Sequence, residues 1–379
     1  MRIAIVGGGA VGSSIAYHLA RRPDFKGAIT VIERDPTYRI ASSSLSASSI
    51  RQQFSTPACI AMSQYGWDFL ANMPEAGLLR RPYLFLATTS GAEILRENHA
   101  IQRAHGADIS LLDSAALKAR FPWINTDDIA LGAVGESGEG WFDGPGLLGE
   151  LRRRARGLGV TYTPQDASGF QRSGDQLTGV HLADGALVAA DIIVNAGGPW
   201  AARIAGWAGI DLPVRARKRM IYVVDCRAPL PDCPLVIDPT GIFFRPEGRF
   251  FIAGRSPGDG EPDPDEPPLD VTEDMYHDHV WPALANRVPA FEAIKIQSSW
   301  AGYYEYNIFD QNGIIGRHPA CPNLYFANGF SGHGIQHSPA TGRAISELIL
   351  DGAFTTTDLS VLGFDRVIEN RPLIEKNIV

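Results

Sequence analysis

Short apolar runs alternate along the chain with longer runs that carry apolar residues at helical spacing, and this alternation predicts an α/β fold. Arg2–Val6 (RIAIV) is a continuous apolar, β-branched run, as expected for a buried parallel strand. Ser13–Arg22 carries Ile15, Leu19 and several alanines at helical spacing, and Ala28–Ile32 is a second strand-like run. Together these segments predict one βαβ unit of the required length.

The same pattern returns later in the chain. Ile192–Asn195 and Leu324–Ala327 are strand-like and each is followed by a glycine turn, and Ile335–Leu350 has the apolar spacing of an amphipathic helix. Between them lie alternating or apolar runs typical of strands in a sheet, at 219–225, 241–247 and 249–254. Pro246-Glu247-Gly248 lies where the last two runs meet, and it predicts a hairpin.

A glycine motif connects the first predicted strand to the first predicted helix. Gly7, Gly9 and Gly12 spell G-x-G-x-x-G, and Glu33 follows 21 residues after the last glycine, at the end of the second strand. In a dinucleotide site Gly7 allows the tight turn, Gly9 lets backbone N–H groups approach a pyrophosphate, and Gly12 lets the helix pack on the strand. Glu33 would accept hydrogen bonds from the adenosine ribose and repel a 2′-phosphate. The alternative is a glycine-rich turn without a ligand, and the motif alone does not choose between FAD and NAD.

Composition narrows the class of protein. The chain has 379 residues, with 45% hydrophobic and 20% charged residues, as in ordinary globular proteins. The net charge of −8 gives no electrostatic indication of a nucleic-acid partner. No apolar stretch has the length of a membrane span, and the run Ile3–Val6 is too short for a signal peptide. The four cysteines include no CxxC pair and favour free thiols. We therefore expect a cytoplasmic protein, with peripheral attachment to a membrane or a partner left open.

Two further segments indicate which dinucleotide is bound. Ala41–Pro57 (ASSSLSASSIRQQFSTP) contains seven serines, whose hydroxyls can face a pyrophosphate before the chain runs under a flavin ring. The alternative interpretation is that this segment is an ordinary polar loop, although Ile50, Arg51 and Phe54 are unusual in a linker. Near the other end, the glycine turn NGFSGHG begins the helix predicted at Ile335–Leu350. A helix N-terminus aimed at the N1–C2=O edge of a flavin would stabilise the anionic reduced ring.

The blocks GGGAVG with Glu33, the segment around Arg51, VNAGGPWA, SWAGYYE and NGFSGHGIQHSPATGRAI together resemble the D-amino-acid oxidase superfamily of flavoproteins. The resemblance covers essentially the whole chain, in order, and is closest to the branch of FAD-dependent oxidoreductase domain-containing proteins. It implies FAD as cofactor and two interleaved domains, a Rossmann-type βαβ domain and a substrate domain built on a large mixed β-sheet. The expected FAD-binding domain comprises residues 1–79, 140–213 and 312–379, and the substrate-binding domain comprises residues 80–139 and 214–311.

The same resemblance implies the residues that would hold FAD. They lie in the first glycine turn and after β-strand ends, in the serine segment, in VNAGGPWA, in SWAGYYE and in the second glycine turn. The predicted set is Gly7, Gly9, Ala10, Val11, Gly12, Glu33, Arg34, Ser42, Ser43, Ser44, Ser48, Ser49, Ala196, Gly197, Trp200, Gly302, Gly329, Gly332, His333, Gly334, Ile335 and Gln336.

In enzymes of this superfamily a hydride passes from the carbon of a C–N bond to flavin N5 and the imine product hydrolyses, so the protein supplies a pocket and a carboxylate clamp rather than a nucleophile. Arg51 is the first candidate for the clamp, because a guanidinium holds a carboxylate with two hydrogen bonds. The alternative for Arg51 is a surface or phosphate-facing role. Tyr304 stands where glycine oxidase and D-arginine dehydrogenase carry a substrate-binding arginine, which puts a simple α-amino-acid substrate in doubt. Tyr303 and Tyr304 either donate hydroxyls or only pack.

Other candidate catalytic residues lie on the predicted hairpin and in the second glycine turn. Phe244 and Arg245 are expected near the flavin ring, and because side chains alternate along a strand only one of them can face the site. His333 either faces the edge of the flavin or has a structural role. His333 and His337 are four residues apart without a third ligand, so we predict no metal. His277 and His279 are interpreted as surface or partner contacts.

Two departures from the superfamily pattern affect the chemistry. Gly302 stands where sarcosine oxidases tether FAD through a cysteine, and no histidine lies between Glu33 and Phe54, where dimethylglycine dehydrogenases have one. We therefore expect non-covalent FAD. The lysine that promotes the oxygen reaction of sarcosine oxidases aligns near Ile252, which favours a dehydrogenase that passes electrons to a carrier over an oxidase that uses O2.

Three functions remain from the sequence. The first is oxidation of the C–N bond of a carboxylated small-molecule amine, an amino acid or N-alkyl amino acid, with an electron carrier or O2 as acceptor and a possible partner subunit. The second is FAD-dependent oxidation of a 2-hydroxy acid or polyol. The third is a flavin-binding assembly or scaffold protein without small-molecule turnover. The Pro/Asp/Gly-rich stretch Ser256–Asp270 is interpreted as a solvated loop, with a lid or docking role as the alternative.

Overall fold

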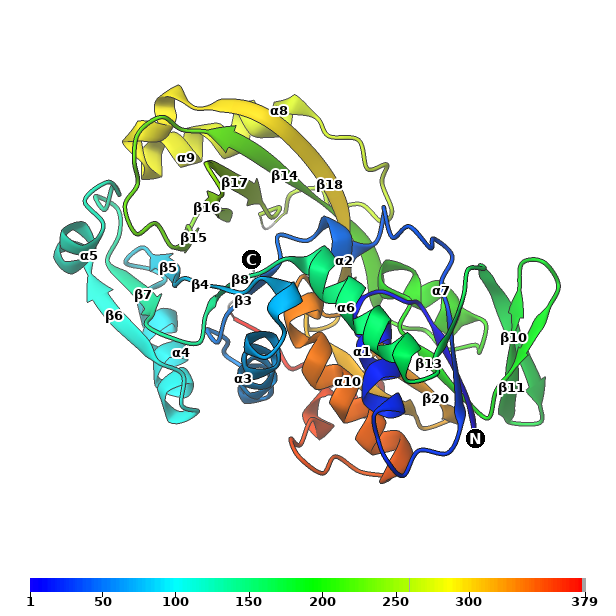
Figure 1. The fold of residues 1–379 in the computed structure, drawn as a ribbon. Coiled ribbons are helices and arrows are strands. Elements are labelled where there is room, and N and C mark those ends of the chain that lie inside the picture. The colour runs from blue at the N-terminus through cyan, green and yellow to red at the C-terminus, as the bar shows by residue number, and fades with distance from the viewer. Residues whose placement is uncertain (259, 377–379) are drawn as a thin grey trace.

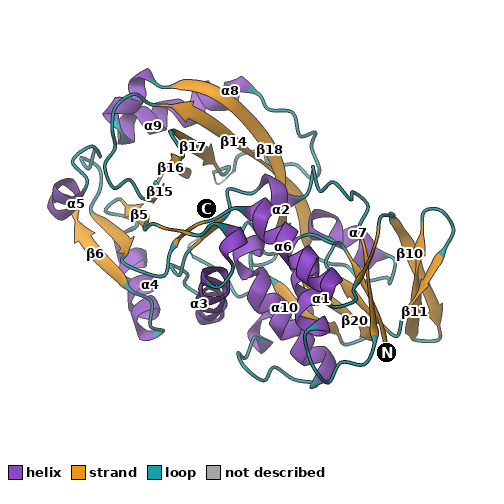
Figure 2. Cartoon of the chain, viewed as in Figure 1, coloured by secondary structure: helices purple, strands orange, loops and turns teal. Residues whose placement is uncertain are grey.

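The fold is taken from a computed structural model that describes residues 1–258 and 260–376. Two large β-sheets organise the chain, one with its helices in the lower right of the view and one across the top and left (Figure 1). Smaller sheets of three strands flank them, and the distribution of helices, strands and loops is drawn in Figure 2. This arrangement confirms the predicted α/β class with large mixed sheets.

The first sheet has six strands in the order β19-β20-β13-β1-β2-β9. β1 pairs in parallel with β2 on one side and with β13 on the other, so that Ile5 lies between Val31 and Val194. β19 is antiparallel to β20 at one edge. The strands are β1 (Arg2–Val6), β2 (Ala28–Ile32), β9 (Thr161–Thr163), β13 (Ile192–Asn195), β19 (Ile314–His318) and β20 (Cys321–Asn328).

Both faces of this sheet are covered, which explains why β1 is apolar at consecutive positions. Ile3 and Ile5 pack on one face with residues of the helices α1 and α10, whereas Ala4 and Val6 pack on the other face with residues of β11 and α7. The elements on these faces are α1 (Ala10–Ala20), α3 (Pro57–Ala71), α6 (Gly144–Gly157), α7 (Ala201–Gly206), α10 (Gly334–Leu350), β10 (Ala167–Ser173), β11 (Gln176–Leu182) and β12 (Leu187–Ala189).

The second sheet has eight strands in the order β18-β14-β17-β16-β15-β5-β7-β6. β14 and β18 are long antiparallel partners that run from the top of the molecule down to the first sheet (Figure 1). The strands are β5 (Tyr83–Ala87), β6 (Ile109–Asp113), β7 (Leu131–Gly135), β14 (Val214–Asp225), β15 (Leu235–Ile237), β16 (Ile242–Glu247), β17 (Phe250–Arg255) and β18 (Lys295–Asn307). One face packs under α9 (Trp281–Arg287) and its neighbouring turns, and α4 (Ala92–Ala104) covers the other.

Short elements complete the chain. A small sheet of β3 (Ser49–Ile50), β8 (Gly140–Trp141) and β4 (Leu79–Arg80) lies between the two large sheets. The remaining helices are α2 (Ser42–Leu45), α5 (Ser114–Arg120), α8 (Glu273–Met275) and α11 (Asp365–Ile368), with a π-helical turn at Tyr276–Val280 and short 3-10 turns. Within the described ranges, none of the helices combines the length and the apolar composition that crossing a bilayer requires.

The strands that sequence predicted at Arg2–Val6, Ala28–Ile32 and Ile192–Asn195 are confirmed with these bounds. The first helix begins at Ala10, three residues before the predicted start, because the glycine motif itself forms its first turn. The hairpin is confirmed, since Glu247 pairs with Phe250 across Gly248, whose φ is +60°. Strands of both large sheets come from separated parts of the chain, and the exact domain boundaries stay a prediction.

Candidate functional site

The first glycine turn joins β1 to α1. Gly7 has φ +103°, and a Cβ there would lie 2.2 Å from the carbonyl oxygen of Ala196. A Cβ on Gly12 would lie 1.9 Å from the carbonyl oxygen of Gly7, so both positions are closed by the protein's own backbone. Gly9 differs, because its nearest neighbour would be the Ser43 hydroxyl at 3.3 Å and it lines an open cavity. Gly7 thus allows the turn, Gly12 allows close packing, and Gly9 leaves room for a ligand to approach.

Glu33 follows β2 and faces the same cavity. Its Oε2 accepts a hydrogen bond from the Gly8 N–H at 2.8 Å, and its Oε1 accepts one from the Asp35 N–H at 2.9 Å. Burial raises the pKa of this carboxyl, and the two backbone donors act against that shift. The carboxyl group is therefore held in one orientation in the cavity wall, next to the glycine turn.

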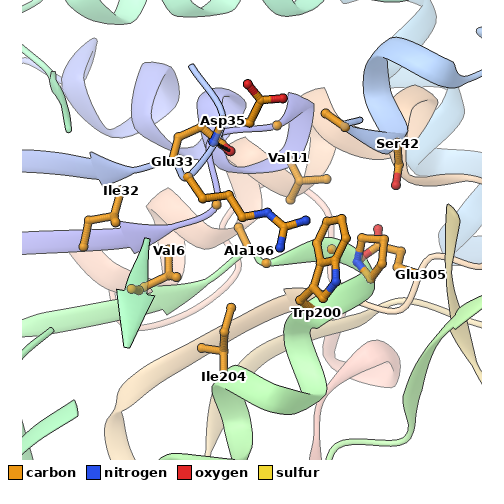
Figure 3. Close-up of a pocket in the computed structure, with 18 of the residues that line it drawn as sticks. Val6, Val11, Ile32, Glu33, Asp35, Ser42, Ala196, Trp200, Ile204 and Glu305 are labelled. Carbon is orange, nitrogen blue, oxygen red and sulfur yellow. Dashed lines mark hydrogen bonds between the residues drawn. The ribbon is translucent and has the colours of Figure 1, made fainter. Parts of the chain in front are cut away.

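The first cavity lies between the glycine turn and the segment after β13 (Figure 3). The Arg34 guanidinium lies over the Trp200 ring, 3.5 Å from its centroid, and the Trp200 indole N–H donates to Glu266. The cavity is long, polar along the glycine turn and apolar at Val6, Ile32 and Ile204. Of the predicted cofactor residues, it is lined by Gly7, Gly9, Ala10, Val11, Glu33, Arg34, Ser42, Ser43, Ala196, Gly197 and Trp200.

A second cavity continues from the first towards β14, β16 and β18. The residues shared by both cavities form a waist, defined by Ala10, Val11, Ser42, Ser43 and Glu305. At the waist the Ser43 hydroxyl accepts a hydrogen bond from the Ala10 N–H at 2.9 Å, which fixes the serine segment on the first turn of α1. Of the predicted cofactor residues, Gly302, Gly332, Gly334 and Ile335 line this second cavity.

The second glycine turn presents the N-terminus of α10 to this second cavity. Gly332 has φ +95°, and a Cβ there would lie 2.5 Å from the Tyr304 ring. A Cβ on Gly334 would lie 2.9 Å from Glu305 Oε1. The backbone can therefore approach Tyr304 and Glu305 only as glycine, and the positive end of a 17-residue helix faces the cavity.

A third cavity adjoins the second and contains Arg51. Arg51 is 2% exposed, and its guanidinium lies 4.1 Å from the Phe54 ring centroid with Nη2 3.0 Å from His333 Nε2. The backbone N–H of Arg51 donates to Gln336 Oε1 at 3.0 Å. Burial lowers the pKa of Arg51, and burial with the nearby guanidinium lowers the pKa of His333 well below its usual range. His333 is thus a neutral imidazole. The other walls are Ser48, Ser49, Tyr83, Tyr304 and apolar side chains.

The buried carboxyl group of Glu139 holds together two segments next to the third cavity. Glu139 accepts hydrogen bonds from the Gln52 N–H at 2.9 Å, from Gln53 Nε2 at 3.1 Å and from the Tyr83 N–H at 3.0 Å. Desolvation raises its pKa to about 7. Glu139 therefore ties the segment Gln52–Gln53, which directly follows Arg51, to the start of β5.

Five predicted site residues do not line the three cavities. Gly12 packs on Gly7, and Gly329 donates its N–H to Glu305 Oε2 at 3.2 Å. Ser44 lies in α2 without reaching a cavity wall. The remaining two are Phe244 and Arg245.

The expectation for Phe244 is corrected by the register of β16. Its side chain is fully buried in the core, with its ring 5.2 Å from that of Phe291, and Phe243 takes the place in the walls of the second and third cavities. Arg245 shares the Phe243 side of the strand, but its Nη2 donates to the Ala47 carbonyl at 2.6 Å and its guanidinium pairs with Glu247. Arg245 thus braces the serine segment instead of lining a cavity.

Several wall residues were missed at the sequence level. Phe243 is adjacent to a residue that was chosen, and the strand register that separates them is a tertiary property. Arg219 and Arg255 also line the second cavity, and they pair with Asp263 and Glu261 of the stretch 256–270 at 2.9 and 2.6 Å. Glu305 was inside a quoted motif without an assigned role. His277 and His279 are exposed, as expected.

Comparison with known proteins gives concordant matches. The sequence model of the family described as "FAD dependent oxidoreductase" matches residues 2–348. The FAD-dependent oxidoreductase domain-containing protein 1 of Xenopus laevis is 44% identical, covering 100% of this chain and 84% of that protein. A glycine oxidase of Geobacillus kaustophilus is 26% identical and 97% of each chain is covered. Among solved structures, L-proline dehydrogenase from P. horikoshii superposes with a TM-score of 0.87 at 25% identity, covering 98% of both chains.

The walls of the first two cavities fit FAD. Gly9 leaves open the space that a Cβ would fill at the helix N-terminus, and the carboxyl group of Glu33 is held in the wall of the first cavity by backbone N–H groups. Beyond the waist, the α10 N-terminus and Gly302 border the second cavity. A ligand with an adenosine, a pyrophosphate and a flavin would meet a carboxylate, a helix N-terminus with serines, and a second helix N-terminus in that order.

Proposed function

Because the chain belongs to the D-amino-acid oxidase family of FAD-dependent oxidoreductases, we propose that it oxidises the C–N bond of a carboxylated amine, an amino acid or N-alkyl amino acid. FAD is the cofactor of this family, and when bound it accepts a hydride from the substrate carbon. The protein's part is to bind the carboxylate, to orient the amine and to exclude water from the third cavity.

The observation that carries this proposal is the position of Arg51. A buried guanidinium lines the third cavity, next to the second glycine turn, and this cavity adjoins the second one. Phe243, Leu235 and Ile237 line the same cavity and exclude water, which strengthens a guanidinium–carboxylate pair. Tyr83 and Tyr304 add phenol groups to this wall. A small carboxylated amine with an apolar body matches these walls.

His333 is proposed to orient Arg51 rather than to move a proton. Its Nε2 faces Arg51 Nη2, so this nitrogen is an acceptor without a proton to give. The substrate amine must therefore reach the site as the free base or lose its proton to solvent before the C–H bond breaks. The rate of flavin reduction should therefore rise with pH through the pKa of the substrate amine.

We further propose an electron carrier, not O2, as the acceptor. Ile252, at the expected place of the oxygen-activating lysine, is 1% exposed and lies outside the three cavity walls. The cations of the second cavity, Arg219 and Arg255, are each held by a carboxylate of the stretch 256–270. A paired cation offers little stabilisation to superoxide. The walls of the first two cavities contain no cysteine or histidine in the described part of the chain, so FAD is proposed to be non-covalent.

The test is anaerobic reduction of the holoprotein by single donors. The panel contains glycine, sarcosine, proline, larger N-methyl amino acids, D-amino acids and matched 2-hydroxy acids, and the flavin absorbance is the readout. Bleaching by one amine class and not by its hydroxy analogue supports the proposal. Bleaching by hydroxy acids contradicts it in favour of alcohol oxidation. A flavin that no donor bleaches contradicts it in favour of an assembly role or a required partner subunit.

Admitting air to the reduced protein tests the acceptor. Slow recolouring in air and fast recolouring on adding a quinone or an electron-transfer dye would support a dehydrogenase. Fast recolouring in air with one hydrogen peroxide per donor would contradict it.

A further inference from the structure

Glu305 is the acidic side chain at the waist between the two cavities. It lines both of them, together with Ala10, Val11, Ser42 and Ser43, and Figure 3 draws it at one end of the first cavity beside Trp200. The other waist groups are suited to an anion, because they are the first turn of α1 and two hydroxyls. A carboxyl group in this position needs an explanation, since a dinucleotide bound across both cavities would carry its pyrophosphate past these residues.

The contacts of Glu305 fix its orientation. Oε2 accepts the Gly329 N–H at 3.2 Å, and the carbonyl oxygen of Glu305 accepts the Ser331 N–H at 3.1 Å. The residue thus fastens the second glycine turn to β18 while its side chain stays in the cavity wall. Its strand neighbour on β14 is Ala216, which brings no charge to it.

Among the described residues, none of the charged groups that line the two cavities forms an ion pair with Glu305. Charged side chains of the first cavity are Glu33, Arg34, Asp35, Asp166 and Arg203, and those of the second are Arg219 and Arg255 with the phenols Tyr303 and Tyr304. Arg219 and Arg255 are engaged by Asp263 and Glu261, and Arg203 by Glu266. His333, at the start of α10, pairs with Arg51. Desolvation raises the pKa of Glu305 to about 8, against the pull of the backbone N–H groups of Gly329 and Phe330.

We propose that Glu305 is a neutral carboxylic acid at the waist and donates its O–H to the bound FAD at the pyrophosphate or the adjoining ribityl chain. A neutral acid removes the repulsion that a carboxylate would exert on the pyrophosphate and adds a donor to the helix N-terminus and the serines. FAD affinity then depends on a proton held by Glu305. This inference rests on the cofactor and not on the substrate, so it stands or fails separately from the amine proposal.

Release of FAD from the diluted holoprotein tests the proposal without any turnover. Flavin fluorescence gives the dissociation constant from pH 6.5 to 9.5. For the wild type we expect a constant value up to about pH 7.5 and then a rise that approaches tenfold per pH unit, because the free protein loses the proton that the complex retains and must take it up again to bind FAD. Glu305→Gln keeps an acceptor for the Gly329 N–H and a donor towards the cavity, so its dissociation constant should stay near the neutral-pH wild-type value throughout.

Glu305→Asp is the matched variant, since it keeps a titratable acid one methylene shorter. It should bind FAD more weakly at neutral pH and still lose affinity as pH rises. A wild-type dissociation constant that is flat across this range, or a Glu305→Gln variant with the same pH profile as the wild type, would overturn the proposal. Weaker binding by Glu305→Gln at pH 6.5 with no pH dependence in the wild type would identify Glu305 as an ionised acceptor instead.

Discussion

Arg51 Nη2 lies 3.0 Å from His333 Nε2, although the two residues are separated by 282 positions in the chain. The contact joins the serine segment to the second glycine turn at the wall of the third cavity. Because the guanidinium can only donate, His333 Nε2 must accept, and the imidazole is neutral with its proton on Nδ1. The contact with a neutral imidazole thus helps to hold the guanidinium in a fixed orientation.

Replacing Arg51 tests its role as the carboxylate clamp. Arg51→Lys keeps a positive charge but loses the two-pronged donor geometry, so we expect retained FAD and a kcat/KM for carboxylated donors that falls by about 100-fold, or roughly 3 kcal/mol. The same substitution at the exposed Arg249 is the control and should change neither quantity. Unchanged flavin reduction by Arg51→Lys with carboxylated donors would remove Arg51 from the clamp.

Gly9 and Gly12 allow a paired test of the first glycine turn. A side chain at Gly9 meets little of the protein, whereas a Cβ on Gly12 would lie 1.9 Å from the Gly7 carbonyl oxygen. Gly9→Val should therefore fold with a free energy of unfolding within about 1 kcal/mol of the apo wild type and lose FAD. Gly12→Ala should lose stability itself, seen as a lowered melting temperature or insolubility.

The two variants are distinguished by circular dichroism and by flavin absorbance. If Gly9→Val purified yellow with full FAD occupancy, the assignment of that glycine to the pyrophosphate would be wrong. A Gly12→Ala variant as stable as the wild type would contradict the packing role of Gly12.

More of the fold than of the site could be predicted from the sequence. β1, β2 and β13 could be predicted because strands covered on both faces carry apolar residues at consecutive positions, and each is followed within two residues by a glycine or by Glu33. The walls of the first cavity followed, since a glycine turn and an acid at the end of the next strand lie at the same sheet edge. This part of the wall depends only on residues close together in the chain, whereas the wall after β13 is added by tertiary packing.

The second and third cavities could not be predicted in the same detail. Arg51 meets His333 only through tertiary packing, and the orientation of Glu305 depends on β18 lying against the second glycine turn. In β16 both Phe243 and Phe244 are aromatic, so the alternation of side chains predicts that one faces the site without saying which one. The choice is made by α9 and its neighbouring turns, which bury Phe244.

Glu139 predicts a pH dependence of stability. Its pKa is about 7 in the folded protein against 4.5 for an unperturbed carboxyl, so the folded state holds the proton more tightly. The stability contributed by this group is present below pH 4.5 and is lost as pH rises through 7. Between pH 5 and pH 8 the wild type should therefore lose about 2 to 3 kcal/mol relative to Glu139→Gln, which does not titrate.

Urea unfolding of both proteins at several pH values measures this difference. In Glu139→Gln an amide N–H₂ group faces one of the two backbone N–H groups whose hydrogen bonds Glu139 accepts. That backbone donor loses its acceptor, so the variant should be less stable than the wild type at pH 5. The pH dependence of the difference, not its size at one pH, is the diagnostic quantity. A difference that is constant from pH 5 to pH 8 would show that Glu139 does not change its proton occupancy on unfolding in this range.

Phe243 and Phe244 give a last test, because two adjacent and identical side chains point to opposite faces of one strand. Phe244 is fully buried with Phe291 and Trp123 around its ring, so Phe244→Ala should cost about 3 to 5 kcal/mol of unfolding free energy. Phe243 lines the second and third cavities and should cost clearly less when truncated. Phe243→Ala should keep FAD and enlarge the space beside Arg51, so that KM falls for bulky carboxylated amines relative to small ones. Equal losses of stability in the two variants, with an unchanged order of substrates in Phe243→Ala, would place neither phenylalanine in the site.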